Sequence, residues 1–213
     1  LIVLLFGDKF IQIIKKFQFN QNFDGRAPES HKKKDGTPTM GGILIIGSVV
    51  LSGLIWGDLS NKYLLLGLAC LVGFAIIGFI DDYKKIFSLD STGLSSTTKI
   101  FYQAMVALVV SVILFASSTS PQELEYIVPF FKNISIELGV GFVFLSVFIL
   151  VGSSNAVNLT DGLDGLAILP VIIITAALGI IAWAAGNVIA AEYLYIPYLA
   201  TTGELLVLCG ALI

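Results

Sequence analysis

The first group of residues that could do chemistry is a basic, glycine-rich segment, His31–Gly42. Its three successive lysines end at Lys34, and Thr39 stands just before two glycines and a long apolar run. Lysines, hydroxyls and a glycine backbone at a helix N-terminus, where the helix dipole favours negative charge, suit a phosphate site. The same residues also suit a basic patch on anionic lipid, with Thr39 as the helix cap. Spacing alone leaves both interpretations open.

The second group is an acidic pair, Asp81 and Asp82, which ends an apolar run and precedes Lys84 and Lys85. Adjacent carboxylates repel each other, and the dipole at a helix C-terminus disfavours negative charge. A divalent cation would remove both costs, and Mg²⁺ commonly takes one or two carboxylates together with substrate phosphates. The alternative is a helix whose end simply reaches the lipid headgroups. The charge arrangement favours function, with Asp81 and Asp82 as candidate metal ligands.

The third group is a ridge of amides and carboxylates in which every third residue is polar. Its members are Asn155, Asn158, Asp161 and Asp164. This spacing brings neighbouring members together wherever the backbone is helical, although Gly162 and Gly165 indicate that a helix ends or begins here. One of the two acids could simply cap the next helix. Four polar groups are more than a cap needs, so we expect them to recognise a polar head group by hydrogen bonds.

Together the three groups favour phosphoryl transfer. Lysines can hold phosphates, the acidic pair can hold a metal, and the polar ridge can bind a head group. Such reactions are catalysed mainly by positioning and charge stabilisation. Because each group borders an apolar run, we expect one soluble and one lipidic substrate.

The composition requires these groups to be positioned by a membrane protein. Of 213 residues, 56% are hydrophobic and only 13% are charged, with a mean hydropathy of +0.93. Soluble domains carry about 25% charged residues, and a globule of this size could not bury so much apolar surface. Disordered, collagen-like and disulfide-rich classes are excluded as well. Cys70 and Cys209 lie inside apolar runs, which is typical of packed residues rather than of a disulfide.

The fold class that follows is all-α, a polytopic transmembrane bundle forming one integral membrane domain over residues 1–213. About seven full or partial crossings are expected, because a span needs about 20 apolar residues. Their apolar runs are Leu1–Phe6, Thr39–Trp56, Tyr63–Ile80, Ile100–Ala116, Leu138–Gly152, Leu166–Ala185 and Leu205–Ile213. Between the fourth and fifth runs, Gln122–Leu138 has the alternation of a short β-hairpin with its turn near Lys132 and Asn133.

Lysine and arginine set the orientation. The first and third connections carry ten basic residues, and the connections on the opposite side carry only Lys62 and Lys132. The positive-inside rule therefore places all three polar groups on the cytoplasmic face and the hairpin outside.

Three motifs of this chain resemble those of a known family. They are Gly36-Thr37-Pro38-Thr39-Met40-Gly41-Gly42, Asp81-Asp82-Tyr83 and Asn158-Leu159-Thr160-Asp161-Gly162-Leu163-Asp164-Gly165. In order and placement they resemble the phospho-N-acetylmuramoyl-pentapeptide-transferases, within the polyprenyl-phosphate N-acetylhexosamine-1-phosphate transferases. The resemblance covers essentially the whole chain. The Thr39-Met40-Gly41-Gly42 segment favours this branch over the N-acetylglucosamine branch.

The resemblance implies a reaction at the bacterial plasma membrane in peptidoglycan synthesis. Phospho-N-acetylmuramoyl-pentapeptide moves from UDP-MurNAc-pentapeptide to undecaprenyl phosphate, giving lipid I and UMP, with Mg²⁺ as cofactor. Asp81 and Asp82 would be catalytic acids near the metal, with Asp81 acting as a base or as a nucleophile. The substrate-binding positions implied are Lys34, Thr39, Lys85, Lys99, Asn158, Asp161 and Asp164. The expected partners are the two substrates, membrane lipid and a second copy in a homodimer, with no nucleic acid.

Two elements of the family do not occur in these residues, namely a later metal-binding acid and a histidine-rich cytoplasmic loop. Family members have about ten crossings, and the run from Leu205 is short for a span. We therefore expect residues 1–213 to be the N-terminal portion of a longer enzyme and to be inactive alone. Two competing functions are a GlcNAc-1-phosphate transferase acting on the same lipid and a cation-coupled transporter. The transporter is disfavoured because the acids gather at one face instead of at mid-membrane.

Overall fold

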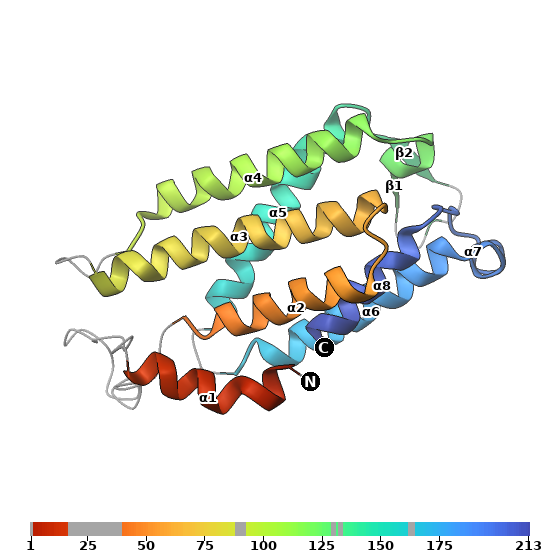
Figure 1. Ribbon diagram of the computed structural model, residues 1–213. Coiled ribbons are helices and arrows are strands. Elements are labelled where there is room, and N and C mark those ends of the chain that lie inside the picture. Colours follow the sequence, from red (N-terminus) through yellow and green to blue (C-terminus); the bar gives the residue numbers. More distant parts are fainter. Residues whose placement is uncertain (1, 17–39, 88–92, 129–130, 132–133, 162–164) are drawn as a thin grey trace.

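The chain forms a bundle of helices in a computed structural model that describes residues 2–16, 40–87, 93–128, 131, 134–161 and 165–213 (Figure 1). These residues contain eight α-helices, two short 3-10 helices and one pair of strands. The α-helices are α1 (Ile2–Lys16), α2 (Gly42–Trp56), α3 (Lys62–Phe87), α4 (Ser96–Ala116), α5 (Gly141–Thr160), α6 (Ile168–Gly186), α7 (Val188–Leu194) and α8 (Leu205–Leu212). The 3-10 helices are η2 (Pro121–Leu124) and η3 (Thr202–Glu204).

Four of these helices are long and apolar enough to cross a membrane. They are α3, counted over Lys62–Lys85, together with α4, α5 and α6. The span of α3 has 24 residues, which at the rise of an α-helix covers about 36 Å. Helices form here because lipid offers no partner for backbone polar groups, so each segment must satisfy its own. The prediction of a multi-pass helical membrane protein is confirmed.

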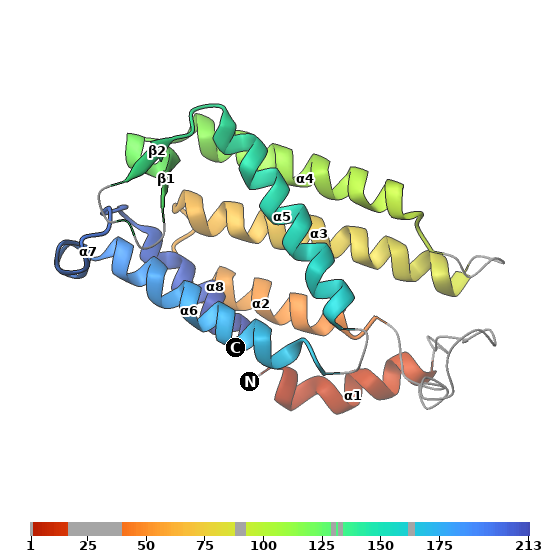
Figure 2. The same cartoon turned by 180° about the vertical axis from the view of Figure 1, so that it is seen from behind.

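The buried core lies where α2, α3 and α8 meet. Its centre is formed by Val49, Leu64, Leu68 and Leu208, with Leu64 completely buried. Gly67 on α3 permits this close approach, because a Cβ there would lie 2.7 Å from a methyl group of Leu208. Around this core, α4 packs against both α3 and α5, and α8 packs against α2 and α6. Figures 1 and 2 show the C-terminal ends of α3 and α5 at the same end of the bundle as the first turns of α2 and α4.

The predicted β-hairpin is present at the opposite end. Strand β1 (Glu125–Ile127) pairs antiparallel with β2 (Ser135–Glu137), with Tyr126 opposite Ile136. The expected turn at residues 132–133 lies outside the described part of the chain.

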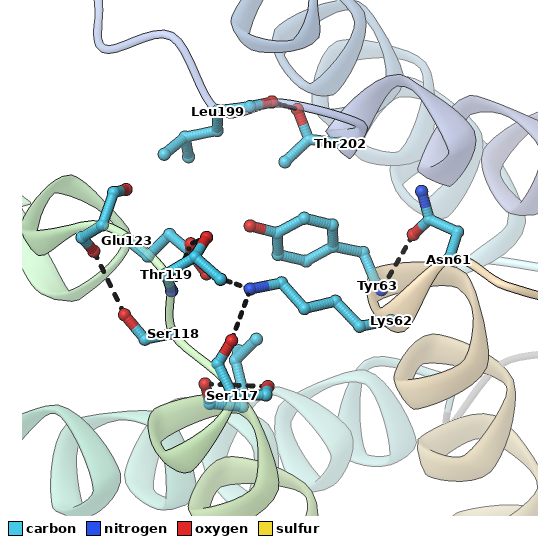
Figure 3. Close-up of polar contacts among 11 residues, drawn as sticks. Asn61, Lys62, Tyr63, Ser117, Ser118, Thr119, Glu123, Leu199 and Thr202 are labelled. Carbon is cyan, nitrogen blue, oxygen red and sulfur yellow. Dashed lines mark hydrogen bonds and ion pairs between the residues drawn. The ribbon is translucent and has the colours of Figure 1, made fainter.

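A polar network beside the hairpin connects the helix ends at this end of the bundle (Figure 3). Lys62, at the start of α3, forms a 2.6 Å ion pair with Glu123 and donates a hydrogen bond to the carbonyl of Ser117 at 2.8 Å. Burial alone would raise the pKa of Glu123, but its partners Lys62, Thr119 and Tyr63 lower it to about 2. The side chain of Asn61 accepts hydrogen bonds from the first turn of α3 and donates one to the carbonyl of Thr201.

The helices extend further than the apolar runs predicted. Helix α1 reaches Lys16 rather than ending near Phe6, α3 continues through Asp81 to Phe87, and α5 continues to Thr160. A window of apolar residues detects only the part of a helix that lipid surrounds, whereas intrahelical hydrogen bonds continue into polar sequence. The short helix α7 was not predicted.

Candidate active site

Asp81 is a closely held side chain at the end of the bundle opposite the hairpin. Its carboxylate is 8% exposed and lies 2.7 Å from the Lys85 ammonium, one turn further along α3. The ammonium of Lys99, from the first turn of α4, lies 3.6 Å from the same oxygen, Oδ2. The backbone N–H of Leu94 donates a 2.8 Å hydrogen bond to the other oxygen, Oδ1. Two cations and one amide therefore satisfy a buried carboxylate that would otherwise be costly.

The Leu94 hydrogen bond depends on the glycine that precedes it. Gly93 has a φ of +63°, in the left-handed region that side chains disfavour. A Cβ at this position would lie 2.7 Å from Asp81 Oδ1 and 2.9 Å from Lys85 Cε. Only glycine lets the chain approach this closely, and the next amide then points at the carboxylate. Ser95 follows as the N-cap of α4 and accepts a hydrogen bond from the Thr98 N–H.

Asp82 lies in a different environment from its neighbour. Its side chain is 32% exposed, and the nearest cation is Lys85 at 3.6 Å. It lines a groove of about 390 Å³ between α2 and α3 whose other walls are almost entirely apolar. Those walls include Met40 and Ile43 at the start of α2 and Phe79 on α3.

A second, more polar pocket lies on the other side of α3. It has a volume of about 300 Å³ and is lined by Lys99, Asn158 and Asp161, together with Gln103 and Ser154. Gly78 on α3 borders both this pocket and the apolar groove. The structure thus brings together six predicted residues around the end of α3. Asp81, Asp82, Lys85 and Lys99 form one charged cluster, and Asn158 and Asp161 line the same pocket as Lys99.

The polar ridge does not act as one surface. Asn155 turns toward α4, where its amide donates a 2.7 Å hydrogen bond to Gln103 Oε1. Helix α5 ends at Thr160, and Asp161 is its C-cap, with its N–H donating to the carbonyl of Val157. The alternative role of Asp161 as a cap of α6 is wrong, because that helix begins after Ala167.

Three predicted site residues, Lys34, Thr39 and Asp164, lie outside the described residues. The start of α2 is described, and its N-cap is Gly41 rather than Thr39, with no side-chain hydrogen bond. Met40 just before it has a φ of +70°. The predicted anion site at this helix start therefore stays a prediction.

The acidic pair offers a partial fit to a metal ion. Among the described residues, no group of three or more acidic, histidine or cysteine side chains could hold one. Both oxygens of Asp81 already accept from Lys85 or Leu94, whereas Asp82 has a single long contact. A single carboxylate completed by substrate phosphates is an ordinary arrangement for Mg²⁺. Asp82 is therefore the residue that fits this role, and Asp81 fits it poorly.

Two residues of the site were not identified from the motifs. Gly93 follows a short polar stretch, Asp90-Ser91-Thr92, and such a stretch is a turn signal that could have been used. Gln103 is a lone amide in the predicted span Ile100–Ala116, and no sequence pattern indicates its partner.

Comparison with known protein families agrees with this geometry. Residues 64–209, which hold the acidic pair, Lys99 and the polar ridge, match the profile of glycosyl transferase family 4. Residues 34–46, across the basic glycine-rich segment and the start of α2, match phospho-N-acetylmuramoyl-pentapeptide-transferase signature 1. The first match covers more than half of the chain, and the second lies on the motif that suggested this branch. The chain therefore belongs to glycosyl transferase family 4, in its phospho-N-acetylmuramoyl-pentapeptide-transferase branch, which confirms the resemblance drawn from the three motifs.

Proposed function

We propose that this protein transfers phospho-N-acetylmuramoyl-pentapeptide from UDP-MurNAc-pentapeptide to undecaprenyl phosphate, giving lipid I and UMP. The observation that carries the proposal is that the acidic pair is linked to two unlike cavities: Asp82 lines the apolar groove, and Asp81 pairs with Lys99, which lines the polar pocket. The polar pocket suits a soluble nucleotide-sugar, and the apolar groove suits the first isoprene units of a lipid phosphate. The family places the chain among phospho-sugar transferases but leaves the substrates to this argument.

In the proposed reaction, an oxygen of the lipid phosphate attacks the phosphorus that carries the sugar. The bond from that phosphorus to the oxygen bridging the two donor phosphates breaks, and UMP leaves with that bridging oxygen. Lys85 and Lys99 lie where they can neutralise charge on these phosphates, while Asn158 and Asp161 can hydrogen-bond to the donor. Asp81 keeps both lysines in place, and Asp82 faces the acceptor groove.

Mg²⁺ is part of the proposal as a cofactor held by Asp82 and the donor phosphates. Bound there, it would stabilise charge that develops on the phosphoryl oxygens. We further propose that the site faces the cytoplasm of a bacterial plasma membrane, because most of the chain's basic residues lie in the sequence that joins α1 to α2 or flank the α3–α4 connection.

The test is UMP release by the native full-length protein in detergent with undecaprenyl phosphate and Mg²⁺. We expect release with UDP-MurNAc-pentapeptide and at most a trace with UDP-GlcNAc. Release with UDP-GlcNAc alone would replace the proposed function with the sister transferase activity. No release from either donor, together with ion-driven substrate counterflow in proteoliposomes, would indicate a transporter.

A further inference from the structure

Gln103 is a buried polar side chain on α4 that none of the three motifs contains. Only 4% of its surface is exposed. It lies one helical turn after Lys99, so both side chains project from the same face of α4. A buried amide is stable only when its polar atoms find hydrogen-bond partners, and such partners are therefore informative.

The partners of Gln103 all lie on α5. Asn155 Nδ2 donates to Gln103 Oε1 at 2.7 Å, and Gln103 Nε2 donates to Ser154 Oγ at 3.4 Å. Asn155 also donates to the carbonyl of Val151 at 2.8 Å, which holds its amide group in one orientation. Within the described residues, these are the side-chain hydrogen bonds that join α4 to α5.

This connection controls how the two helices present the polar pocket. Asn158 is one turn beyond Asn155 on α5, and Asp161 closes the same helix, while Lys99 is one turn before Gln103 on α4. The other residues of both helices are mostly apolar, and apolar contact has no preferred direction. Hydrogen bonds are directional, so Gln103 fixes the rotation and the register of one helix against the other.

We propose that Gln103 is a positioning residue for the polar pocket, acting through Asn155 to hold Asn158 and Asp161 opposite Lys99. The inference that the pocket receives the nucleotide-sugar rests on the proposed function. The positioning itself rests only on the contacts between α4 and α5.

A double-mutant cycle in the native full-length protein tests this role. Gln103→Met keeps the length of the side chain and removes its hydrogen bonds, and Asn155→Leu removes the partner. We expect either variant to raise the KM for UDP-MurNAc-pentapeptide about tenfold, which corresponds to about 1.4 kcal/mol, with kcat within about twofold of wild type. The double variant should be no worse than either single one.

Ser111→Ala is the matched control. Ser111 is also on α4, is 1% exposed, and its hydroxyl has no hydrogen-bond partner among the described residues. Removing it should leave KM unchanged. A lower unfolding temperature for Gln103→Met with unchanged KM would show a purely structural role and overturn the proposal.

A second measurement does not depend on the substrate. Spin labels at Tyr102→Cys and Leu159→Cys report the α4–α5 geometry near the pocket, in a background with Cys70, Cys209 and any further cysteine of the full-length protein replaced by alanine. We expect Gln103→Met to broaden the distance distribution and Ser111→Ala to preserve it. An unchanged distribution in Gln103→Met would overturn the positioning role. A broadened distance distribution in a protein that neither binds nor turns over UDP-MurNAc-pentapeptide would support positioning and refute the proposed function.

Discussion

Substitution of Gly93 by alanine tests whether the candidate active site depends on the close approach of the α3–α4 connection to Asp81. The φ of +63° costs alanine about 1 kcal/mol relative to glycine. The new methyl group would also lie 2.7 Å from Asp81 Oδ1 and 2.9 Å from Lys85 Cε, so the chain must withdraw. Withdrawal lengthens or breaks the Leu94 hydrogen bond to the carboxylate, and a hydrogen bond to a charged group contributes about 1.5–3 kcal/mol.

Loss of that hydrogen bond lets the Asp81 carboxylate rotate, and with it the ammonium groups of Lys85 and Lys99. If the whole free energy of the lost hydrogen bond is lost from the stabilisation of the transition state, kcat should fall about 10- to 100-fold. The assay is UMP release at saturating UDP-MurNAc-pentapeptide, with the unfolding temperature measured on the same preparations.

Gly139→Ala supplies the control for backbone strain. Gly139 has a φ of +49°, and a Cβ there would meet no atom within 4 Å. This variant should lose about the same 1 kcal/mol of stability that a positive φ costs alanine at Gly93. It should keep wild-type turnover, since Gly139 lies at the hairpin end of the bundle. Turnover of Gly93→Ala within about twofold of the Gly139→Ala value would refute the role of the Leu94 amide.

Three further outcomes are expected. Asp81→Asn and Asp82→Asn should each lower kcat by about 10²-fold or more in folded protein, because each removes charge beside the transferring phosphates; UMP release within a few-fold of wild type for both would contradict the catalytic assignment. Asp161→Ala should weaken donor binding by roughly 1–3 kcal/mol and leave binding of the lipid phosphate unchanged, as calorimetry can measure. Because the pKa of Glu123 is lowered from 4.5 to about 2, its ion pair with Lys62 should contribute stability above pH 4.5 that is lost as the pH falls toward 2. The contribution is about 1–2 kcal/mol after solvent screening. Lys62→Met should therefore weaken the dependence of the unfolding temperature on pH between pH 6 and pH 3. An equal dependence on pH in the variant and the wild type would show that the pair contributes nothing.

Much of the fold followed from apolar residues alone. The ends of α2 at Trp56 and of α4 at Ala116 coincide with the ends of the predicted runs. The prediction was wrong for α1, where polar and apolar residues alternate along an amphipathic helix that is not a uniform run. It also missed the extension of α3 beyond Ile80, because Asp81 and Asp82 end the apolar run without ending the helix.

The structure brings several predicted site residues together, but the sequence indicated only some of the contacts between them. The Asp81–Lys85 pair follows from helical spacing, since residues four apart are neighbours. The Lys99 contact does not, because it depends on how α4 packs against α3. The sequence does not indicate the role of Gln103 for the same reason. Its partner Asn155 is 52 residues away, and only tertiary packing brings the two together.

The geometry of α3 determines the directions in which the two carboxylates of the acidic pair point. Successive residues on an α-helix point about 100° apart, so the two adjacent carboxylates face different neighbouring helices, although Lys85 reaches both. Asp81 turns toward α4 and its lysine, and Asp82 turns toward the groove at the start of α2. The proposed function needs one acidic group beside the lysines that would hold the donor phosphates and another beside the acceptor groove. Two consecutive aspartates at a helix end meet that need, and separating them by a single inserted residue would rotate one of them away from its partner.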